Sequence, residues 1–251
     1  MRDTITILGV PIDRVTKDEA GNITEQLIKE SNKSCKMIFA PNVEFIMTAQ
    51  KDKEFFNLLK SSSLSTPDSI GVIIGAKLQH KSFKERIPGQ SYFRKIIELS
   101  NEKGYSIYLL GGNPGIPEKA KENLKKVFPN VNIVGLHHGY FDEDEEKKII
   151  EEINALKPNV LFVALGAPKQ EKWIYNNRHK LQVDVAAGQG GTYDYEAGKI
   201  KRAPVFIQKI GMEWFWRLIR EPSRIKRQLV LPIYLIKVLF AKDKTKGKFD
   251  I

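Results

Sequence analysis

The sequence predicts an α/β protein in which a parallel sheet is covered by helices on both faces. Short apolar runs alternate with longer segments of helical spacing along most of the chain. The runs are apolar at nearly every position, as in SIYLLGG (106–112) and NVLFVALG (159–166). Strands buried on both faces have this character, and strand–helix alternation places them side by side in parallel. With 251 residues, 41% of them hydrophobic, the chain is large enough to bury such a core, which excludes global disorder.

The predicted strands are short runs of β-branched or apolar residues bounded by turn residues. In chain order they are 4–10, 36–40, 106–112, 132–139, 159–166 and 183–188. The segment GVIIGAK (71–77) is strand-like, or a strand that runs into a helix.

The predicted helices carry apolar residues at helical spacing, and several have clear end signals. Gly104 is suited to the C-cap of one helix, and Pro129 closes the next. The helix that begins near residue 142 has an acid-rich first turn, which suits the helix macrodipole. The full set is 43–62, 92–104, 117–130, 142–158 and 168–181.

The chain divides into an α/β body, residues 1–204, and a helical, basic C-terminal appendage, residues 205–251. Residues 199–251 hold 14 Lys and Arg against 4 Asp and Glu, so most of the net charge of +11 lies there. We expect helices in the appendage that are interrupted at Pro222 and Pro232.

Aromatic, aliphatic and cationic side chains are mixed throughout residues 205–240. This mixture is typical of a segment that lies in a membrane interface and contacts anionic headgroups. The apolar run 228–240 is too short to span a bilayer. The prediction is therefore that this segment associates peripherally with an anionic membrane surface. A helix packed on the body is one alternative. A non-enzymatic nucleic-acid binder is another, disfavoured because no recognised nucleic-acid motif is present.

Cysteine and histidine usage narrows the chemistry. Cys35 is the single cysteine, so an internal disulfide and a cysteine-rich zinc site are excluded, and we expect it to be a small core residue. The amino terminus lacks the pattern of a signal peptide, which together with the cysteine usage indicates a reducing compartment. The four histidines show no metal-ligand spacing, and no metal site is assigned.

Candidate site residues gather where the predicted strands end. The carboxyl ends of parallel strands meet at one edge of a sheet, and ligands bind there. We expect one site that includes Asn42, Glu44, Gly111, Gly112, Gly166, Pro168, Gln170, Glu171 and Asp194.

Three of these segments suit a phosphorylated sugar ligand. LLGGNPG (109–115) resembles a turn that cradles a phosphate before a helix, although an ordinary strand-to-helix turn fits equally. Gln170 in LGAPKQEKW suits a sugar or phosphate oxygen, or begins an ordinary amphipathic helix. In the glycine-dense segment 188–204, Asp194 suits a nucleobase or a ribose hydroxyl and Arg202 a phosphate. A loop without function is the alternative for that segment.

Two further residues are candidates on chemical grounds. Asp68 in STPDSIG suits a general base acting on a hydroxyl, while the alternative is a turn residue, which is what aspartate usually is in such a sequence. Arg86 in ERIPGQ suits a diphosphate, and is otherwise a surface arginine.

Seven segments together, in this order, resemble the WecG/TagA/CpsF family of bacterial glycosyltransferases over roughly residues 1–230. They are PNVEF (41–45), PDSIGV (67–72), RIPGQ (86–90), LLGGNPG (109–115), PNVLFVALGAPKQEKW (158–173), GGTYDYEAGKIKRAP (190–204) and EWFWRLIREPSRIKR (213–227). The segments look most like the teichoic acid linkage-unit enzymes of that family. The resemblance implies a Rossmann-like α/β core, and a peripheral protein that acts on the cytoplasmic, inner face of the cell membrane.

The resemblance also implies an activity. Such an enzyme moves N-acetylmannosamine from UDP-N-acetylmannosamine to the 4-hydroxyl of undecaprenyl-diphosphate-linked N-acetylglucosamine, with inversion and without a cofactor or catalytic metal. A related donor, such as UDP-N-acetylmannosaminuronic acid or another nucleotide sugar, stays open, and so does self-association into a homo-oligomer.

Residue roles follow from the same resemblance. Asp68 corresponds to the base that deprotonates the acceptor. Gln170 and the glycine turns would hold the UDP diphosphate, and Asp194 the uracil or ribose end, with Tyr140 also binding substrate. Arginines of the appendage would fold over the site and stabilise the diphosphates in place of a metal; these are Arg217, Arg224 and Arg227.

The chain departs from the family pattern at several positions near the expected site, among them Gln90 and Ser91, which replace a segment that often carries an aspartate. Ala40 replaces a frequent threonine and removes a hydroxyl, and Gln189 stands where an apolar residue is preferred. Ser69 replaces the glycine that follows the aspartate. If that glycine needs a positive φ, serine costs roughly 1 kcal/mol or more and re-aims Asp68.

Overall fold

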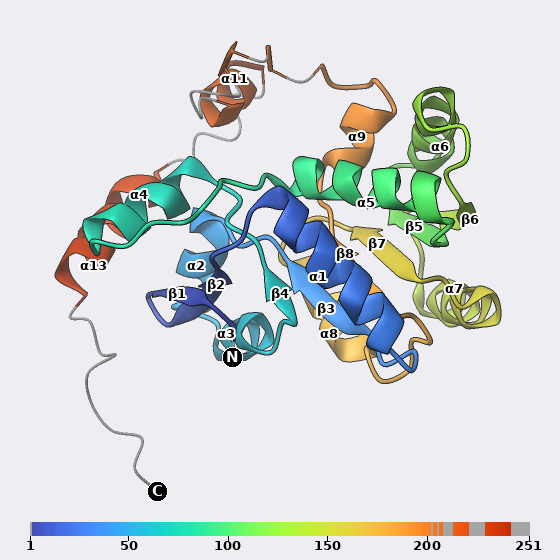
Figure 1. Cartoon of the computed structure of the whole chain (residues 1–251), viewed down its shortest axis with the longest axis horizontal. Helices are drawn as coiled ribbons and strands as arrows, with labels where there is room; N and C mark the ends of the chain where they lie inside the picture. Colours follow the sequence, from blue (N-terminus) through green and yellow to red (C-terminus); the bar gives the residue numbers. More distant parts are fainter. Residues whose placement is uncertain (1, 202, 205, 208–212, 221–228, 242–251) are drawn as a thin grey trace, which may run out of the picture.

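The computed structural model describes residues 2–201, 203–204, 206–207, 213–220 and 229–241 (Figure 1). Its centre is a six-stranded sheet, parallel throughout, in the order β4-β3-β8-β7-β5-β6. This confirms the predicted α/β class and is consistent with a Rossmann-like fold. From one edge to the other the strands are β4 (Leu64–Ser65), β3 (Lys36–Phe39), β8 (Val185–Gly188), β7 (Val160–Ala164), β5 (Ile107–Gly111) and β6 (Ile133–His137).

Helices cover both faces of the sheet (Figure 1). One face packs against α1 (Lys17–Glu30), α5 (Gly89–Lys103), α6 (Ile116–Val127) and α9 (Thr192–Glu196). The other packs against α2 (Val43–Ala49), α3 (Lys53–Lys60), α4 (Ile70–Leu78), α7 (Glu143–Leu156), α8 (Lys169–Asn177) and α13 (Val230–Phe240). Successive residues of β5 alternate between the two cores, because side chains of a strand point to opposite faces: Leu109 joins the first and Leu110 the second.

The register brings the strand ends together. Ile107 of β5 and Val185 of β8 both pair with Val160 of the central strand β7. The three strands therefore start level and end at one edge, and the loops that follow them share that edge.

The amino-terminal segment differs from the prediction of a single strand over 4–10. It forms an antiparallel hairpin of β1 (Thr4–Ile7) and β2 (Val10–Asp13). Leu8 and Gly9 have φ values of 48° and 86°, which turn the chain back on itself. The hairpin is tied to the edge strand β4, since Oδ2 of buried Asp13 accepts the Ser65 N–H at 2.7 Å.

Two helical segments also correct the sequence interpretation. The predicted helix 43–62 is two helices, α2 and α3, because the Asp52 side chain accepts the Phe55 N–H at 3.0 Å and caps a new helix. The segment 71–77, expected to begin as a strand, is wholly inside helix α4. Its residues Val72 and Ala76, one turn apart, are buried in the core, a spacing that belongs to a helix.

The C-terminal appendage is described in part. Helices α11 (Glu213–Arg220) and α13 confirm helical structure there, and α13 lies beside α4, with Tyr234 and Val238 buried (Figure 1). None of the helices that the structure describes is long and apolar enough to cross a membrane. The division at residue 204 stays a prediction. Cys35 is buried, as expected of a small core residue, and burial raises the pKa of its thiol to about 12.

Candidate active site

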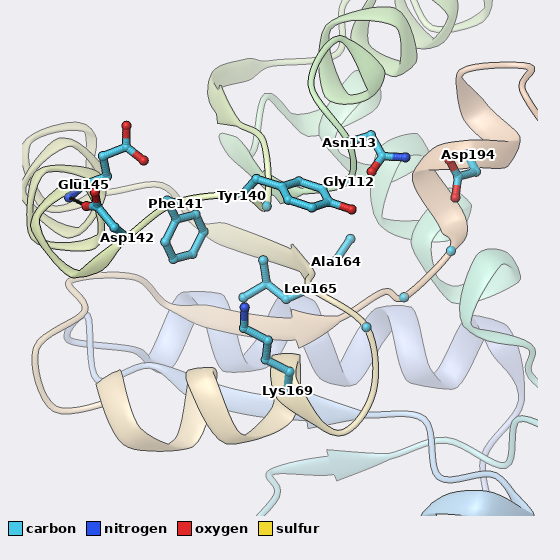
Figure 2. A pocket seen from close by; sticks show the side chains of 14 residues that line it. Gly112, Asn113, Tyr140, Phe141, Asp142, Glu145, Ala164, Leu165, Lys169 and Asp194 are labelled. Atoms are coloured by element: carbon cyan, nitrogen blue, oxygen red, sulfur yellow. Dashed lines mark hydrogen bonds between the residues drawn. The ribbon is translucent and has the colours of Figure 1, made fainter.

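A pocket of about 700 Å³ opens at the carboxyl edge of the sheet (Figure 2). The loops that follow β5, β6, β7 and β8 line it. Glycines make up much of this lining, so ligand atoms can approach the backbone there. They are Gly112, Gly139, Gly166, Gly190 and Gly191.

The end of β5 requires glycine because the chain passes very close to β7. Gly111 has φ +121°, and a Cβ there would lie 2.4 Å from the carbonyl oxygen of Ala164. The N–H of Gly112 donates to the same oxygen at 2.9 Å, and the N–H of Gly139 donates to the Gly112 carbonyl at 2.8 Å. Backbone hydrogen bonds thus draw the loops after β5, β6 and β7 into one wall of the pocket.

Side chains of differing chemistry are spread along the pocket. In Figure 2, Asn113 and Asp194 lie toward one end and Glu145 toward the other, while Lys169 reaches into it from the start of α8. Tyr140, on the loop after β6, is 65% exposed and presents its ring to the pocket. The pocket therefore offers carboxylates toward both ends together with an aromatic ring and an ammonium group, and the last two suit a nucleotide with a phosphate group.

Asp194 lies in helix α9, which is held in place by two neighbouring side chains of the same helix. The Tyr193 hydroxyl donates to the Phe162 carbonyl of β7 at 2.8 Å. The carboxylate of buried Glu196 accepts two hydrogen bonds from Arg94 of α5, at 3.0 and 2.7 Å. Asp194 itself has the Lys199 ammonium 3.4 Å from its Oδ1.

Gln170 and Glu171 lie behind the pocket lining. Both are buried, at 3% and 1% exposed. Nε2 of Gln170 donates to Oε1 of Glu171 at 2.6 Å, and its Oε1 accepts the N–H of Gly190 at 2.9 Å. Burial raises the pKa of Glu171 to about 8, against the opposing effect of the hydrogen bond from Gln170. The pair supports the glycine loop at 190–191.

A second group of predicted residues lies toward the β3 and β4 side of the edge. Oδ1 of Asp68, in the loop after β4, accepts the N–H of Gly89 at 2.9 Å, at the first turn of α5. Asn42 caps α2 by accepting the Phe45 N–H at 3.0 Å. Nη2 of Arg86 lies 3.1 Å from Oε2 of Glu213, so this loop is joined to the first residue of α11.

The chain matches the family model described as "Glycosyl transferase WecG/TagA/CpsF family" over residues 5–248. The chain belongs to this glycosyltransferase family. It is 35% identical over 213 residues to the N-acetylglucosaminyldiphosphoundecaprenol N-acetyl-beta-D-mannosaminyltransferase of Bacillus subtilis (strain 168), covering 85% of this chain and 82% of that protein. The protein of the same name in Staphylococcus aureus (strain MW2) is 28% identical over 242 residues, covering 96% and 94%.

Family membership confirms the resemblance predicted from the sequence and makes this chain a glycosyltransferase rather than a non-enzymatic nucleic-acid binder. The roles assigned to individual residues stay predictions. Four of those residues line the pocket of the transferase: Gly112, Tyr140, Gly166 and Asp194.

The other predicted residues lie outside the pocket lining or outside the described structure. Gly111 is buried at the end of β5, Glu44 lies in the first turn of α2, and Pro168 precedes α8. Arg202, Arg224 and Arg227 fall outside the residues that the structure describes, and of Arg217 only its place in α11 is described.

Sequence reasoning missed several residues that line the pocket of the transferase. Asn113 and Lys169 stand inside two motifs of the predicted site, LLGGNPG and LGAPKQEKW, in which only neighbouring residues are predicted to bind substrate. Phe141 and Asp142 follow β6, so the rule that sites form at the carboxyl ends of strands would have found them.

The departure at Ser69 costs no backbone strain in the transferase. Its φ is −103°, in the extended region open to any residue, and it is the N-cap of α4. The positive φ under which serine would be strained is therefore not present, and Asp68 precedes an ordinary helix start. The other departure of interest, Gln189, is 6% exposed and lies at the end of β8.

Proposed function

We propose that this glycosyltransferase moves N-acetylmannosamine from UDP-N-acetylmannosamine to the 4-hydroxyl of undecaprenyl-diphosphate-linked N-acetylglucosamine, in the synthesis of a teichoic acid linkage unit. The observation that carries the proposal is the nucleotide-sized pocket at the carboxyl edge of the sheet, in a chain 35% identical to a transferase with that name. The pocket takes the nucleotide, and the β3–β4 side of the edge takes the acceptor.

The donor nucleotide is bound by the pocket in this proposal. Tyr140 and Asp194 suit the uracil and the ribose, through an aromatic face and a hydrogen-bond acceptor. Lys169 is exposed at the first position of α8, where its ammonium group and the helix N-terminus both favour a diphosphate. No catalytic metal is needed if Lys169 and the helix N-terminus, with arginines of the appendage, stabilise the negative charge of the departing UDP.

Asp68 is the general base of the proposed reaction. It follows β4, three strands from β7, or about 14 Å at the usual spacing of strands. A donor whose nucleotide fills the pocket then directs its sugar toward Asp68. The carboxylate takes the proton of the acceptor 4-hydroxyl as that oxygen attacks the anomeric carbon from the face opposite UDP. The bond to UDP breaks with its electrons, so the configuration inverts. The Gly89 N–H orients the carboxylate.

The acceptor's lipid places the reaction at a membrane, and the C-terminal helices suit its surface. Along α13, the apolar side chains of Ile233, Ile236, Leu239 and Phe240 are exposed. Ile74 is exposed as well, on the neighbouring helix α4. Together with the basic charge of residues 199–251, these side chains suit insertion among anionic headgroups. The transferase would then act as a peripheral protein on the cytoplasmic face.

The decisive experiment combines UDP binding with the activity of one variant. Calorimetric titration with UDP is expected to show saturable binding that is the same in EDTA and in magnesium. Asp68→Asn is expected to keep the UDP affinity and to lower kcat by about 10²- to 10⁴-fold with a lipid-diphosphate acceptor. Normal turnover of Asp68→Asn would contradict the base role, and failure of the wild type to bind UDP would contradict the donor site.

A further inference from the structure

Gln189 connects the pocket to the residues around Asp68. It follows the last residue of β8 and continues that strand, since its N–H donates to the Val163 carbonyl at 2.7 Å. The next two residues, Gly190 and Gly191, line the pocket. On its other side, Oε1 of Gln189 would lie 3.9 Å from a Cβ placed on Gly89, the residue whose N–H binds Asp68.

Gln189 is a largely buried residue, and of its side-chain amide only the oxygen has a partner in the protein. Its Oε1 lies 3.5 Å from the Thr192 hydroxyl, at the limit of a hydrogen bond. Across the part of the chain that the structure describes, its Nε2 makes no hydrogen bond. That nitrogen is not among the fully buried polar atoms that lack a partner, so the small exposed fraction of the residue, 6%, leaves it open to water or to a ligand. Because Nε2 is purely a donor, its partner must be an oxygen or another acceptor.

The position of the Gln189 side-chain amide determines which part of a bound substrate it can contact. If the nucleotide lies against Gly190 and Gly191, the diphosphate and the sugar continue toward Asp68. Gln189 stands directly before those glycines and beside Gly89, so it borders this path where the donor sugar passes. A primary amide there distinguishes sugars by the oxygen that each places within its reach.

We propose that Gln189 is a specificity-determining residue for the donor sugar, its Nε2 donating a hydrogen bond to an oxygen that the sugar carries. This inference rests on the proposed function, because it takes a UDP-sugar as the donor. The oxygen belongs to the N-acetyl carbonyl or to a ring hydroxyl, and both accept a hydrogen bond from an amide. Methionine in place of Gln189 keeps the length and the unbranched shape of the side chain but removes the donor.

The test is calorimetric titration of the whole chain with UDP, UDP-N-acetylmannosamine and UDP-mannose. The variants are Gln189→Met and, as a matched control, Gln182→Met. Gln182 is exposed and precedes the same strand at its amino end, away from the pocket. UDP is the internal reference, because it reports a folded nucleotide site without involving the sugar.

Gln189→Met is expected to keep the UDP affinity of the wild type within about two-fold and to lower the affinity for UDP-N-acetylmannosamine about five- to ten-fold. If UDP-mannose binds the variant and the wild type equally, the oxygen is the N-acetyl carbonyl; if its affinity falls as well, the oxygen is a ring hydroxyl. Gln182→Met is expected to match the wild type with all three ligands.

Three results would overturn the inference. An equal loss for UDP and the UDP-sugars would show that Gln189 only holds the glycine loop. Unchanged affinity for every ligand would show that the amide has no part in binding. Unchanged donor binding with a raised KM for the acceptor alone would place the amide on the acceptor. In each of these cases wild-type UDP binding persists, whereas its absence would remove the proposed function and the inference together.

Discussion

The side chains of Gln170 and Glu171, neighbours in the sequence, are joined by a hydrogen bond of 2.6 Å from Nε2 to Oε1. Through its own Oε1, Gln170 also holds the N–H of Gly190 at 2.9 Å. The start of α8 therefore supports the pocket loop from behind. The remaining carboxylate oxygen of Glu171, Oε2, is buried and has no hydrogen-bond partner among the described residues. A buried carboxyl in this setting favours its neutral form.

Glu171→Gln should flatten the pH dependence of stability. Burial raises the pKa of Glu171 from 4.5 to about 8 in the folded chain. Between these values the folded state binds a proton that the unfolded state releases, so the free energy of unfolding falls as pH rises through this range. Glutamine keeps the neutral shape and removes the titration. The melting temperature of the variant minus that of the wild type should therefore increase as the pH is raised from about 5 to about 8. Parallel curves would contradict the buried, protonated carboxyl.

Arg94→Ala should destabilise the chain and weaken UDP binding. Arg94 makes two hydrogen bonds to Glu196, whose side chain is 2% exposed, and thereby fixes the helix that carries Asp194. Removal leaves a buried carboxylate with only the Gln90 amide, at 3.2 Å. We expect a loss of roughly 1.5–3 kcal/mol in urea denaturation. Lys119→Ala, which breaks an exposed pair with Glu122, should cost less than about 0.5 kcal/mol. Equal effects in the two variants would argue against the role of the Arg94 pair.

Gly111→Ala should be far more damaging than Gly104→Ala. Both glycines have positive φ, at 121° and 78°. A Cβ on Gly111 would lie 2.4 Å from the Ala164 carbonyl oxygen, whereas one on Gly104 meets nothing within 4 Å. The first variant should lose about 3 kcal/mol or more, and the second about 1 kcal/mol from backbone strain alone. Thermal unfolding of both variants measures the difference. Similar losses would mean that β5 and β7 are further apart at this edge.

Lys169→Ala should weaken the binding of UDP about ten-fold or more while leaving the binding of uridine unchanged, since the ammonium group is assigned to the diphosphate. Lys172→Ala is the matched control. That lysine lies one turn along α8 but pairs with Asp52 and Glu54, at 2.7 and 3.1 Å. Titrations of the two variants with both ligands separate the effects. An equal loss of uridine affinity would assign Lys169 to another part of the ligand.

The sequence predicted the sheet well because its strands are apolar at almost every position, as in β5 and β7. It missed α1 for the opposite reason. The buried face of that helix includes Gly21, Thr24 and Glu25, so its hydrophobic spacing is weak. The capping box of Thr16 and Glu19 was the available signal.

The candidate site was predictable in location but not in detail. The site was correctly predicted at the carboxyl edge of the sheet, because the topology of a parallel sheet alone determines that position. Whether a side chain lines the pocket or supports it from behind depends on how it packs in three dimensions, which the spacing of residues along the sequence does not predict. Gln170 and Glu171, at the start of an amphipathic helix, turn inward beneath the loop, while Lys169 just before them reaches the pocket.

Docking of α13 on the body should depend on Gly75 but not on the Tyr234 hydroxyl. A Cβ on Gly75 would lie 2.0 Å from the Tyr234 oxygen, so Gly75→Ala must displace Tyr234 or tilt α13 away from α4. The hydroxyl is itself buried, and across the described part of the chain it has no hydrogen-bond partner. Tyr234→Phe should therefore leave stability unchanged or raise it slightly, since it removes a buried polar atom that bonds to nothing.

Hydrogen exchange of the amides of α13 measures the docking directly. Gly75→Ala should speed exchange along α13, and Tyr234→Phe should not. Since α13 carries the exposed apolar residues assigned to the membrane, looser docking should also alter binding to vesicles that contain an anionic lipid, while UDP binding in the distant pocket stays the same. Slow exchange in Gly75→Ala would mean that α4 and α13 adjust without separating, because the body then tolerates a methyl group where the structure leaves room for none.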